Sequence, residues 1–346
     1  MYAVIDCGTT NTRVYILNNE NQMVGQAARK VGVRDTSMTG SKDALRNGLR
    51  EAILEAIEKS GAKTKDIKYA IASGMITSEI GLMEIPHLVA PAGIRELAEN
   101  VKIVSGREII SLDIPIMFIR GIRNNYGDNA TLTEIDDVDF MRGEEAQVIG
   151  ILDEYRIKEP VNILVLSSHS KMIHVNGDGK VEASMTTLSG QLFEAVINQT
   201  NVGKSLVPCD GEESGGYTFE EIVTFAGRCV RTKGLVRCFM IPRFMQVLLK
   251  SDYMERRGFV DASIAVDDMN AIRSFDLKYN GGAYILFGPE SRCKLYSYLL
   301  KKEYGENAKI VSVFDKEKLA ELTVRGGVKI ADLYRQLSEK GGIDHV

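Results

Sequence analysis

The sequence predicts an α/β protein built from two similar domains, and three observations support this prediction. The chain of 346 residues is long enough for two domains of ordinary size. Short apolar segments typical of strands alternate with longer segments whose apolar residues have helical spacing. An order of elements found at the start of the chain returns about 160 residues later, and an internal repeat of that size indicates two related domains.

The first half of the chain is expected to begin with strand, turn, strand, hairpin, strand and helix. Apolar residues of the segment 43–60 recur every three or four positions, and Gly61 follows as a stop signal. The expected strands are residues 2–7, 13–17, 22–31, 68–72, 108–111 and 116–119. The expected helices are residues 43–60, 92–101 and 143–155.

The same order of elements begins again at residue 161, with a hairpin turn of sequence Asn-Gly-Asp-Gly at residues 176–179. We therefore expect an N-terminal domain of residues 1–140 and a C-terminal domain of residues 141–346, with the last helix packing back on the first domain. The expected strands are residues 161–166, 172–175, 181–187, 281–287 and 309–313, and helices are expected from about residue 188, over most of 217–273, at 290–302 and at the end of the chain.

Composition and charge narrow the classes of function. The net charge is −4 and no stretch is strongly basic, which argues against a nucleic-acid partner or a membrane surface. The five cysteines are scattered and show no metal-ligand spacing. No basic segment followed by an apolar one begins the chain, so we expect a cytoplasmic protein. The sequence does not fix the oligomeric state, and a homodimer is compatible with it.

The first motif, residues 6–13, reads Asp-Cys-Gly-Thr-Thr-Asn-Thr-Arg and lies between two expected strands. Small and hydroxylated residues let backbone N–H groups and hydroxyls approach an anion closely. An acid at the end of the first strand, Asp6, can hold a water molecule on Mg²⁺. The alternative is a simple hairpin turn rich in glycine and threonine. The segment resembles the first phosphate motif of the superfamily of sugar kinases, heat-shock chaperones and actin.

The second motif, residues 168–171, reads Ser-His-Ser-Lys and stands at the equivalent point of the repeat. Hydroxyl, imidazole and ammonium groups can all bind phosphate or substrate. A solvent-facing turn is the alternative, and the position within the repeat favours the phosphate role.

The third motif, residues 141–147, reads Met-Arg-Gly-Glu-Glu-Ala-Gln at the start of an expected helix. Kinase chemistry needs a carboxylate that accepts the proton of the attacking hydroxyl, and Glu144 lines up with the aspartate of a similar stretch in glycerol kinases. Arg142 can clamp a substrate carboxylate with two hydrogen bonds. The alternative is a helix start with favourably placed acids.

A fourth segment, residues 73–93, contains Ser-Gly-Met-Ile-Thr-Ser, then Glu84 and Pro86, then Pro-Ala-Gly. Long loops inside compact domains are usually functional or mobile, so this segment can supply substrate contacts. An ordinary surface loop is the alternative.

Together these motifs resemble the 2-dehydro-3-deoxygalactonokinase family, whose members phosphorylate 2-keto-3-deoxygalactonate. The resemblance covers most of the chain in order, and it implies two ribonuclease H-like domains with a central cleft, the fold of actin-like ATPases and sugar kinases. The matching segments are residues 6–13, 73–78, 84–86, 91–93, 141–147, 167–171, 187–193 and 230–232.

The resemblance also implies the reaction and its residues. ATP, with Mg²⁺, would phosphorylate 2-dehydro-3-deoxygalactonate at its 6-hydroxyl, and ATP and the sugar acid are the implied partners. Glu144 is the implied base, with Glu145 or Asp6 as alternatives, and Asp6 also positions Mg²⁺ through water. The implied phosphate and nucleotide contacts are Gly8, Thr9, Thr10, Asn11, Arg13, Ser168, His169, Ser170, Lys171 and Gly288. The implied sugar-acid contacts are Ser78, Glu84, Arg142 and Glu145.

The chain departs from the family pattern at a few positions. Cys7 replaces a tryptophan, Ser167 replaces a glycine of the second phosphate motif, and Ala262 and Val266 replace two glycines of a late helix. Two other functions therefore stay open. One is a sugar or nucleotide sensor built on a degenerate kinase, and the other is a phosphohydrolase of the same superfamily.

Overall fold

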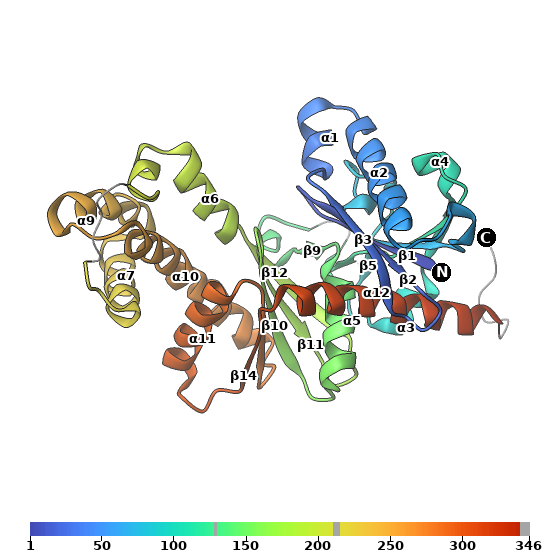
Figure 1. The fold of residues 1–346 in the computed structure, drawn as a ribbon. Helices are drawn as coiled ribbons and strands as arrows, with labels where there is room; N and C mark the ends of the chain where they lie inside the picture. Colours follow the sequence, from blue (N-terminus) through green and yellow to red (C-terminus); the bar gives the residue numbers. More distant parts are fainter. Residues whose placement is uncertain (128–129, 210–214, 340–346) are drawn as a thin grey trace. The chain divides into compact units, whose positions relative to one another are not determined.

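The computed structural model describes residues 1–127, 130–209 and 215–339, and the chain divides into two compact units (Figure 1). Unit 1 holds Met1–Pro160, His174–Ser184 and the segment from Lys316 onward, and unit 2 holds Val161–Ile173 and Met185–Asp315. The first segment of unit 1 thus ends at Pro160, beyond the boundary expected at residue 140.

Unit 1 is built on a six-stranded sheet with the strand order β3-β2-β1-β4-β7-β6. Strand β1 pairs antiparallel with β2 and parallel with β4, so the C-terminal ends of β1 and β4 lie side by side at Cys7 and Gly74. The strands are β1 (Tyr2–Cys7), β2 (Thr12–Leu17), β3 (Met23–Arg29), β4 (Ala70–Gly74), β6 (Lys102–Ser105) and β7 (Pro115–Phe118). A small second sheet contains β5 (Leu88–Val89), β8 (Ile122–Arg123) and β9 (Phe140–Met141).

The helices of unit 1 cover its sheet with apolar faces. Leu45, Leu49 and Ile53 of α2 are fully buried, and this helix packs on β2 and β3 (Figure 1). Their spacing is the helical one predicted from the sequence. The helices are α1 (Val33–Thr39), α2 (Asp43–Lys59), α3 (Ile94–Glu99), α4 (Gly106–Ile110), α5 (Glu144–Tyr155) and α12 (Lys316–Glu339).

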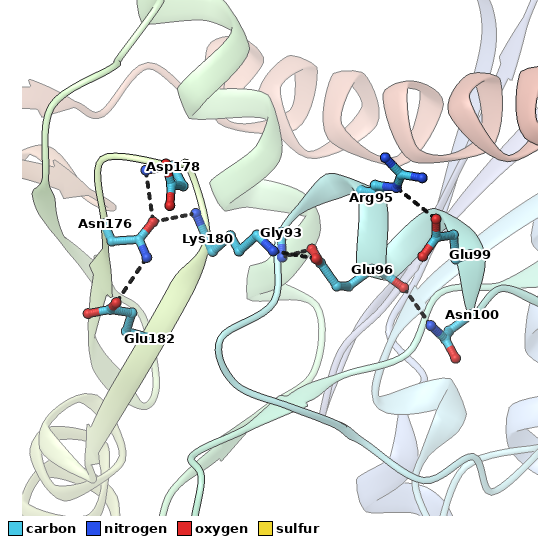
Figure 2. Close-up of polar contacts among 9 residues, drawn as sticks. All are labelled: Gly93, Arg95, Glu96, Glu99, Asn100, Asn176, Asp178, Lys180 and Glu182. Carbon is cyan, nitrogen blue, oxygen red and sulfur yellow. Dashed lines mark hydrogen bonds and ion pairs between the residues drawn. The ribbon is translucent and has the colours of Figure 1, made fainter.

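A hairpin tip completes unit 1. Figure 2 shows Lys180 reaching the carboxylate of Glu96, which also accepts a hydrogen bond from the Gly93 N–H at 2.9 Å. Next to this ion pair, Ala92 and Val181 form an antiparallel β-bridge. The segment His174–Ser184 is therefore held to α3 by the Lys180–Glu96 ion pair and to Ala92, just before α3, by backbone hydrogen bonds.

The sheet that contains β10 has five strands in the order β12-β11-β10-β13-β14. This order repeats β3-β2-β1-β4-β7, and in both sheets the first strand of the repeat pairs in parallel with the fourth. The repeat inferred from the sequence is thus confirmed by the strand order. The strands are β10 (Val161–Leu166), β11 (Ser170–Val175), β12 (Val181–Thr187), β13 (Tyr284–Phe287) and β14 (Ile310–Val313).

The helices of unit 2 include a group formed by α7, α8, α9 and α10 (Figure 1). Within the described ranges, none of the helices is both long enough and apolar enough to cross a membrane. The helices are α6 (Ser189–Gln199), α7 (Phe219–Lys233), α8 (Leu235–Cys238), α9 (Ile241–Leu249), α10 (Tyr253–Lys278) and α11 (Glu290–Tyr304).

Two local predictions in unit 1 were wrong or incomplete. The strand expected at residues 108–111 is instead the end of helix α4, whose Ile110 is fully buried. A short run of β-branched residues fits either state, and tertiary packing decides between them. Helix α1 was not predicted, since its seven residues contain too few apolar positions for a periodic signal.

Helices α5 and α12 cross in unit 1 with their backbones in contact. A Cβ atom at Gly326 would overlap the carbonyl of Ala146, and one at Gly150 would overlap the carbonyl of Leu322. Figure 1 shows α12 running past α5 and α3, and it packs against both. Glycine at both positions thus sets how closely α5 lies against α12.

We expect Gly326→Ala to destabilise the protein by about 1–3 kcal/mol, because the added methyl group has no space at the crossing. Urea denaturation measures the loss. Gly327→Ala is the matched control, since a Cβ there would lie 3.6 Å from Ile71, an ordinary contact distance. Equal midpoints for the two variants would contradict a tight crossing.

Candidate active site

Three stretches of backbone meet in unit 1 at the ends of β1 and β4 and the start of α5. Gly74 has φ +92°, and a Cβ atom there would overlap the carbonyl of Cys7. Gly143 has φ +109°, and its Cβ would lie 3.2 Å from the Gly74 Cα. Asp6 and Glu144 are the sequence neighbours of Cys7 and Gly143, so these two acids flank one backbone contact.

The first loop joins β1 to β2 and is held from one side by α1. The carbonyls of Gly8 and Thr9 accept hydrogen bonds from the N–H groups of Val33 and Arg34, at 3.4 and 2.9 Å. Because C=O and N–H point in opposite directions across a trans peptide, the N–H groups of Thr9 and Thr10 point away from α1. The loop thus presents backbone donors in the manner of an anion-binding nest.

Asp6 lies at the end of β1 with its side chain 22% exposed and one oxygen 3.2 Å from Nη1 of Arg13. Burial raises the pKa of Asp6, and Arg13 opposes that rise. A carboxylate in such a place is stabilised by a bound cation. No group of three or more metal-ligating side chains occurs among the described residues, and Mg²⁺ carried on a polyphosphate needs only one or two carboxylates.

Glu145 fixes the start of α5. It is only 1% exposed, and its two carboxylate oxygens accept the N–H of Gly143 at 2.9 and 2.7 Å. Burial raises its pKa to about 8, and the neighbouring charge of Glu144 adds to the rise. This position favours a role in holding the helix start over the direct sugar contact that the resemblance implies. Glu144, beside it, is half-buried.

Arg142 ties the long loop of unit 1 to the start of α5. Its Nη1 donates to Oγ1 of Thr77 at 2.7 Å and its Nη2 to the carbonyl of Ile85 at 2.8 Å. Ser78 is buried and donates to the carbonyl of Met75 at 2.7 Å, whereas Glu84 is exposed. Arg142 therefore organises the segment on which both predicted sugar contacts lie.

The second loop, residues 167–171, joins β10 to β11 in unit 2. Ser168 is exposed and His169 is half-buried, whereas Ser170 and Lys171 are buried. The Lys171 ammonium donates to Oγ1 of Thr186, so it lies inside the unit. Gly288, at the end of β13, is also buried, and a Cβ there would lie 2.6 Å from the carbonyl of Leu166. Gly288 and the second loop are thus neighbours.

Comparison with known proteins identifies the family of the chain. A sequence profile described as 2-keto-3-deoxy-galactonokinase matches residues 6–323. The chain belongs to this family.

Two relatives of this chain share only a small part of its sequence. It is 22% identical over 223 residues to a probable 2-dehydro-3-deoxygalactonokinase from Rhizobium meliloti (strain 1021), and the match covers 64% of the chain and 65% of the relative's length. A crystal structure from Sinorhizobium meliloti that carries the same enzyme name has a TM-score of 0.72 at 19% identity, with 97% of each chain covered.

The fold also occurs in other proteins. A reductive activator for a corrinoid, iron–sulfur protein has a TM-score of 0.53 at 10% identity, covering 99% of this chain and 62% of the other. The predicted fold class, two ribonuclease H-like domains of the actin-like ATPase and sugar kinase type, is confirmed by these neighbours and by the repeated strand order.

The galactonokinase-family motifs lie in two groups. Unit 1 holds the first loop with Asp6 and Arg13, and the helix start with Arg142, Glu144 and Glu145. Unit 2 holds the second loop and Gly288. The roles of these residues stay predictions.

Sequence reasoning missed a buried polar group behind the second loop. Its members are Asp261 and Asp268 on α10 and Arg292 and Tyr296 on α11. The seven-residue separation of Asp261 and Asp268 places them on one face of a helix that also carries buried apolar residues, and such a pair of acids is the signal that was available.

The pKa of Glu145 gives a prediction about stability. Between its ordinary pKa near 4.5 and its folded value of about 8, the folded state holds a proton that the unfolded state has lost. Stability therefore falls as pH rises from 5 to 8. Glu145→Gln should remove the contribution of this group to the pH-dependent loss of stability, which is on the order of 1–4 kcal/mol.

Urea midpoints of both proteins between pH 5 and pH 8 measure the effect. Glu108→Gln, at an exposed position of α4, is the control and should follow the unaltered chain. Parallel pH curves for Glu145→Gln and the unaltered chain would contradict the assignment.

Proposed function

We propose that this protein transfers the γ-phosphoryl group of ATP to the 6-hydroxyl of 2-keto-3-deoxygalactonate. The observation that carries the proposal is the family match over residues 6–323, and two of its motif acids, Asp6 and Glu144, adjoin the backbone contact of Cys7 and Gly143 with Gly74. Phosphoryl transfer depends mostly on positioning and on stabilising charge, so a close backbone contact beside the two acids suits this chemistry.

The first loop is suited to the polyphosphate of ATP. Its carbonyls are held by α1, which leaves the N–H groups of Thr9 and Thr10 and nearby hydroxyls for the anion. Arg13 adds positive charge beside Asp6. Asp6 would hold Mg²⁺ through water, and the ion would neutralise the charge that develops on the phosphates.

Glu144 is the proposed base. It lies at the first position of α5, next to Glu145, whose carboxylate is committed to the Gly143 N–H. This leaves Glu144 as the half-buried acid of the pair. A base here would accept the proton of the sugar hydroxyl as that oxygen attacks phosphorus. Asp6 is the less suitable base, because it pairs with Arg13 and is the proposed holder of Mg²⁺.

Arg142 is the proposed contact for the sugar-acid carboxylate. A guanidinium has five N–H donors; the bonds to Thr77 and Ile85 use two of them, and Nη2 also lies 3.4 Å from Nδ1 of His87. The remaining donors can bind a planar carboxylate. Ser78 and Glu84 lie on the segment that Arg142 holds, and Glu84, being exposed, suits a sugar hydroxyl better than the buried Ser78.

In unit 2, Ser168 and His169 are the proposed contacts of the second loop to phosphate. Ser170 and Lys171 would act from behind the loop because both are buried. Gly288 would lie beside the adenosine, and its lack of a side chain lets the turn after β13 pack against the Leu166 carbonyl at the end of β10.

We expect the purified chain to release ADP from ATP only when 2-keto-3-deoxygalactonate is present, in an assay that couples ADP to NADH oxidation. Glu144→Gln should lower kcat by about 100- to 10,000-fold, the usual loss for a general base. Glu108→Gln is the matched control and should keep full activity, since its position is exposed on α4.

The same assay separates the two alternatives. Binding of ATP or sugar acid by calorimetry without turnover would identify a sensor. Phosphate release from polyphosphate without an acceptor sugar would identify a phosphohydrolase. No transfer to any 2-keto-3-deoxy acid would refute the specific proposal.

A further inference from the structure

A buried arginine lies directly behind the second loop. Arg292 is 8% exposed in the first turn of α11, and its Nη1 donates to the carbonyl of Ser167 at 2.9 Å. Its Nη2 donates to the hydroxyl of Tyr296 at 3.1 Å. The guanidinium is thus fixed at two points, one of which is the loop backbone.

Charge and packing hold this arginine in place. Asp261 of α10 has one oxygen 3.7 Å from Nε of Arg292, and burial raises the pKa of this acid. The Tyr296 hydroxyl donates to Asp268 of α10, and the Ser189 hydroxyl donates to the same carboxylate oxygen. Helices α10, α11 and α6 are therefore linked by one buried polar network behind the loop.

The network binds the second loop through two backbone carbonyls of that loop. Arg292 holds the carbonyl of Ser167, and the N–H of Gln191 holds the carbonyl of Ser168 at 2.8 Å. In a trans peptide the following N–H points opposite to the carbonyl. The N–H of Ser168 must then point away from Arg292 of α11 and the N–H of His169 away from Gln191 of α6, so both are placed to donate to an anion outside these helices.

We propose that Arg292 is a positioning residue for phosphate binding, which it supports by fixing the Ser167 carbonyl so that the Ser168 and His169 N–H groups face the polyphosphate. This inference rests on the proposed kinase function and deepens it. The side chain of Ser167, which stands where the family motif has a glycine, donates within the loop to the His169 carbonyl at 2.9 Å.

The test compares Arg292→Met with Arg273→Met. Arg273 also joins α10 to α11, through Glu303 at 2.9 Å, but its side chain is 42% exposed and its hydrogen-bond partners among the described residues do not include the loop. In the chain without nucleotide, amide hydrogen exchange over residues 167–171 should quicken about tenfold in Arg292→Met, the effect expected for one lost charge-assisted hydrogen bond. It should stay unchanged in Arg273→Met.

Steady-state kinetics give a second measurement, the KM for ATP compared with the KM for the sugar acid. A purely structural role of Arg292 would not change one KM and spare the other. In Arg292→Met the KM for ATP should rise about tenfold, while the KM for the sugar acid stays within about twofold. Arg292→Lys keeps the charge but not the forked donors, and should restore only part of the ATP affinity. Thermal unfolding verifies that each variant folds.

The outcomes separate this inference from the proposed function. If the chain binds a non-hydrolysable ATP analogue but transfers no phosphoryl group from ATP to the sugar acid, the kinase function is refuted and the loop measurement stays decisive. Unchanged exchange over residues 167–171 in a folded Arg292→Met variant would overturn the role of Arg292. An equal rise of both KM values, or equal exchange in the two methionine variants, would overturn it as well.

Discussion

The backbone contact among Cys7, Gly74 and Gly143 is the constraint on which unit 1 depends. No side chain separates these three segments, so the ends of two parallel strands and the start of a helix are fixed to one another at close to van der Waals distance. The glycine crossing of α5 with α12 fixes the same helix at its middle. Helix α5 is thus fixed at its start and at its middle, and this also fixes the backbone of the acids at its start.

The two loops of the repeat are supported in related but unequal ways. In unit 1 the loop carbonyls accept from backbone N–H groups of α1, which are neutral donors. In unit 2 one carbonyl accepts from a backbone N–H and the other from a buried guanidinium. A charged donor makes a stronger hydrogen bond, yet it needs an acid nearby, and Asp261 supplies one. The support of the second loop therefore needs a buried arginine and a half-buried aspartate behind it.

Much of this fold could be predicted from the sequence because its strands are short buried apolar runs and its repeat is regular. Helix α2 was predicted from apolar spacing and the stop signal at Gly61. The first phosphate motif was found from small residues between strands, and the helix-start motif from acids at an expected helix start and from the resemblance to sugar kinases. Local sequence could not show that Glu145 turns its carboxylate back to Gly143, since that depends on the positive φ of a glycine. Nor could it pair Arg292 with Asp261, because no local rule links positions so far apart.

The division of unit 1 among three stretches of chain has a consequence for biosynthesis. A ribosome makes the sheet of unit 1 first, but α12, which closes over α5, follows only after all of unit 2 has been made. Until then Ala146, Gly150 and the apolar residues around them have no covering helix. The part of the protein that is translated first is therefore the part that finishes folding last, and its nascent form carries an exposed apolar surface that chaperones recognise.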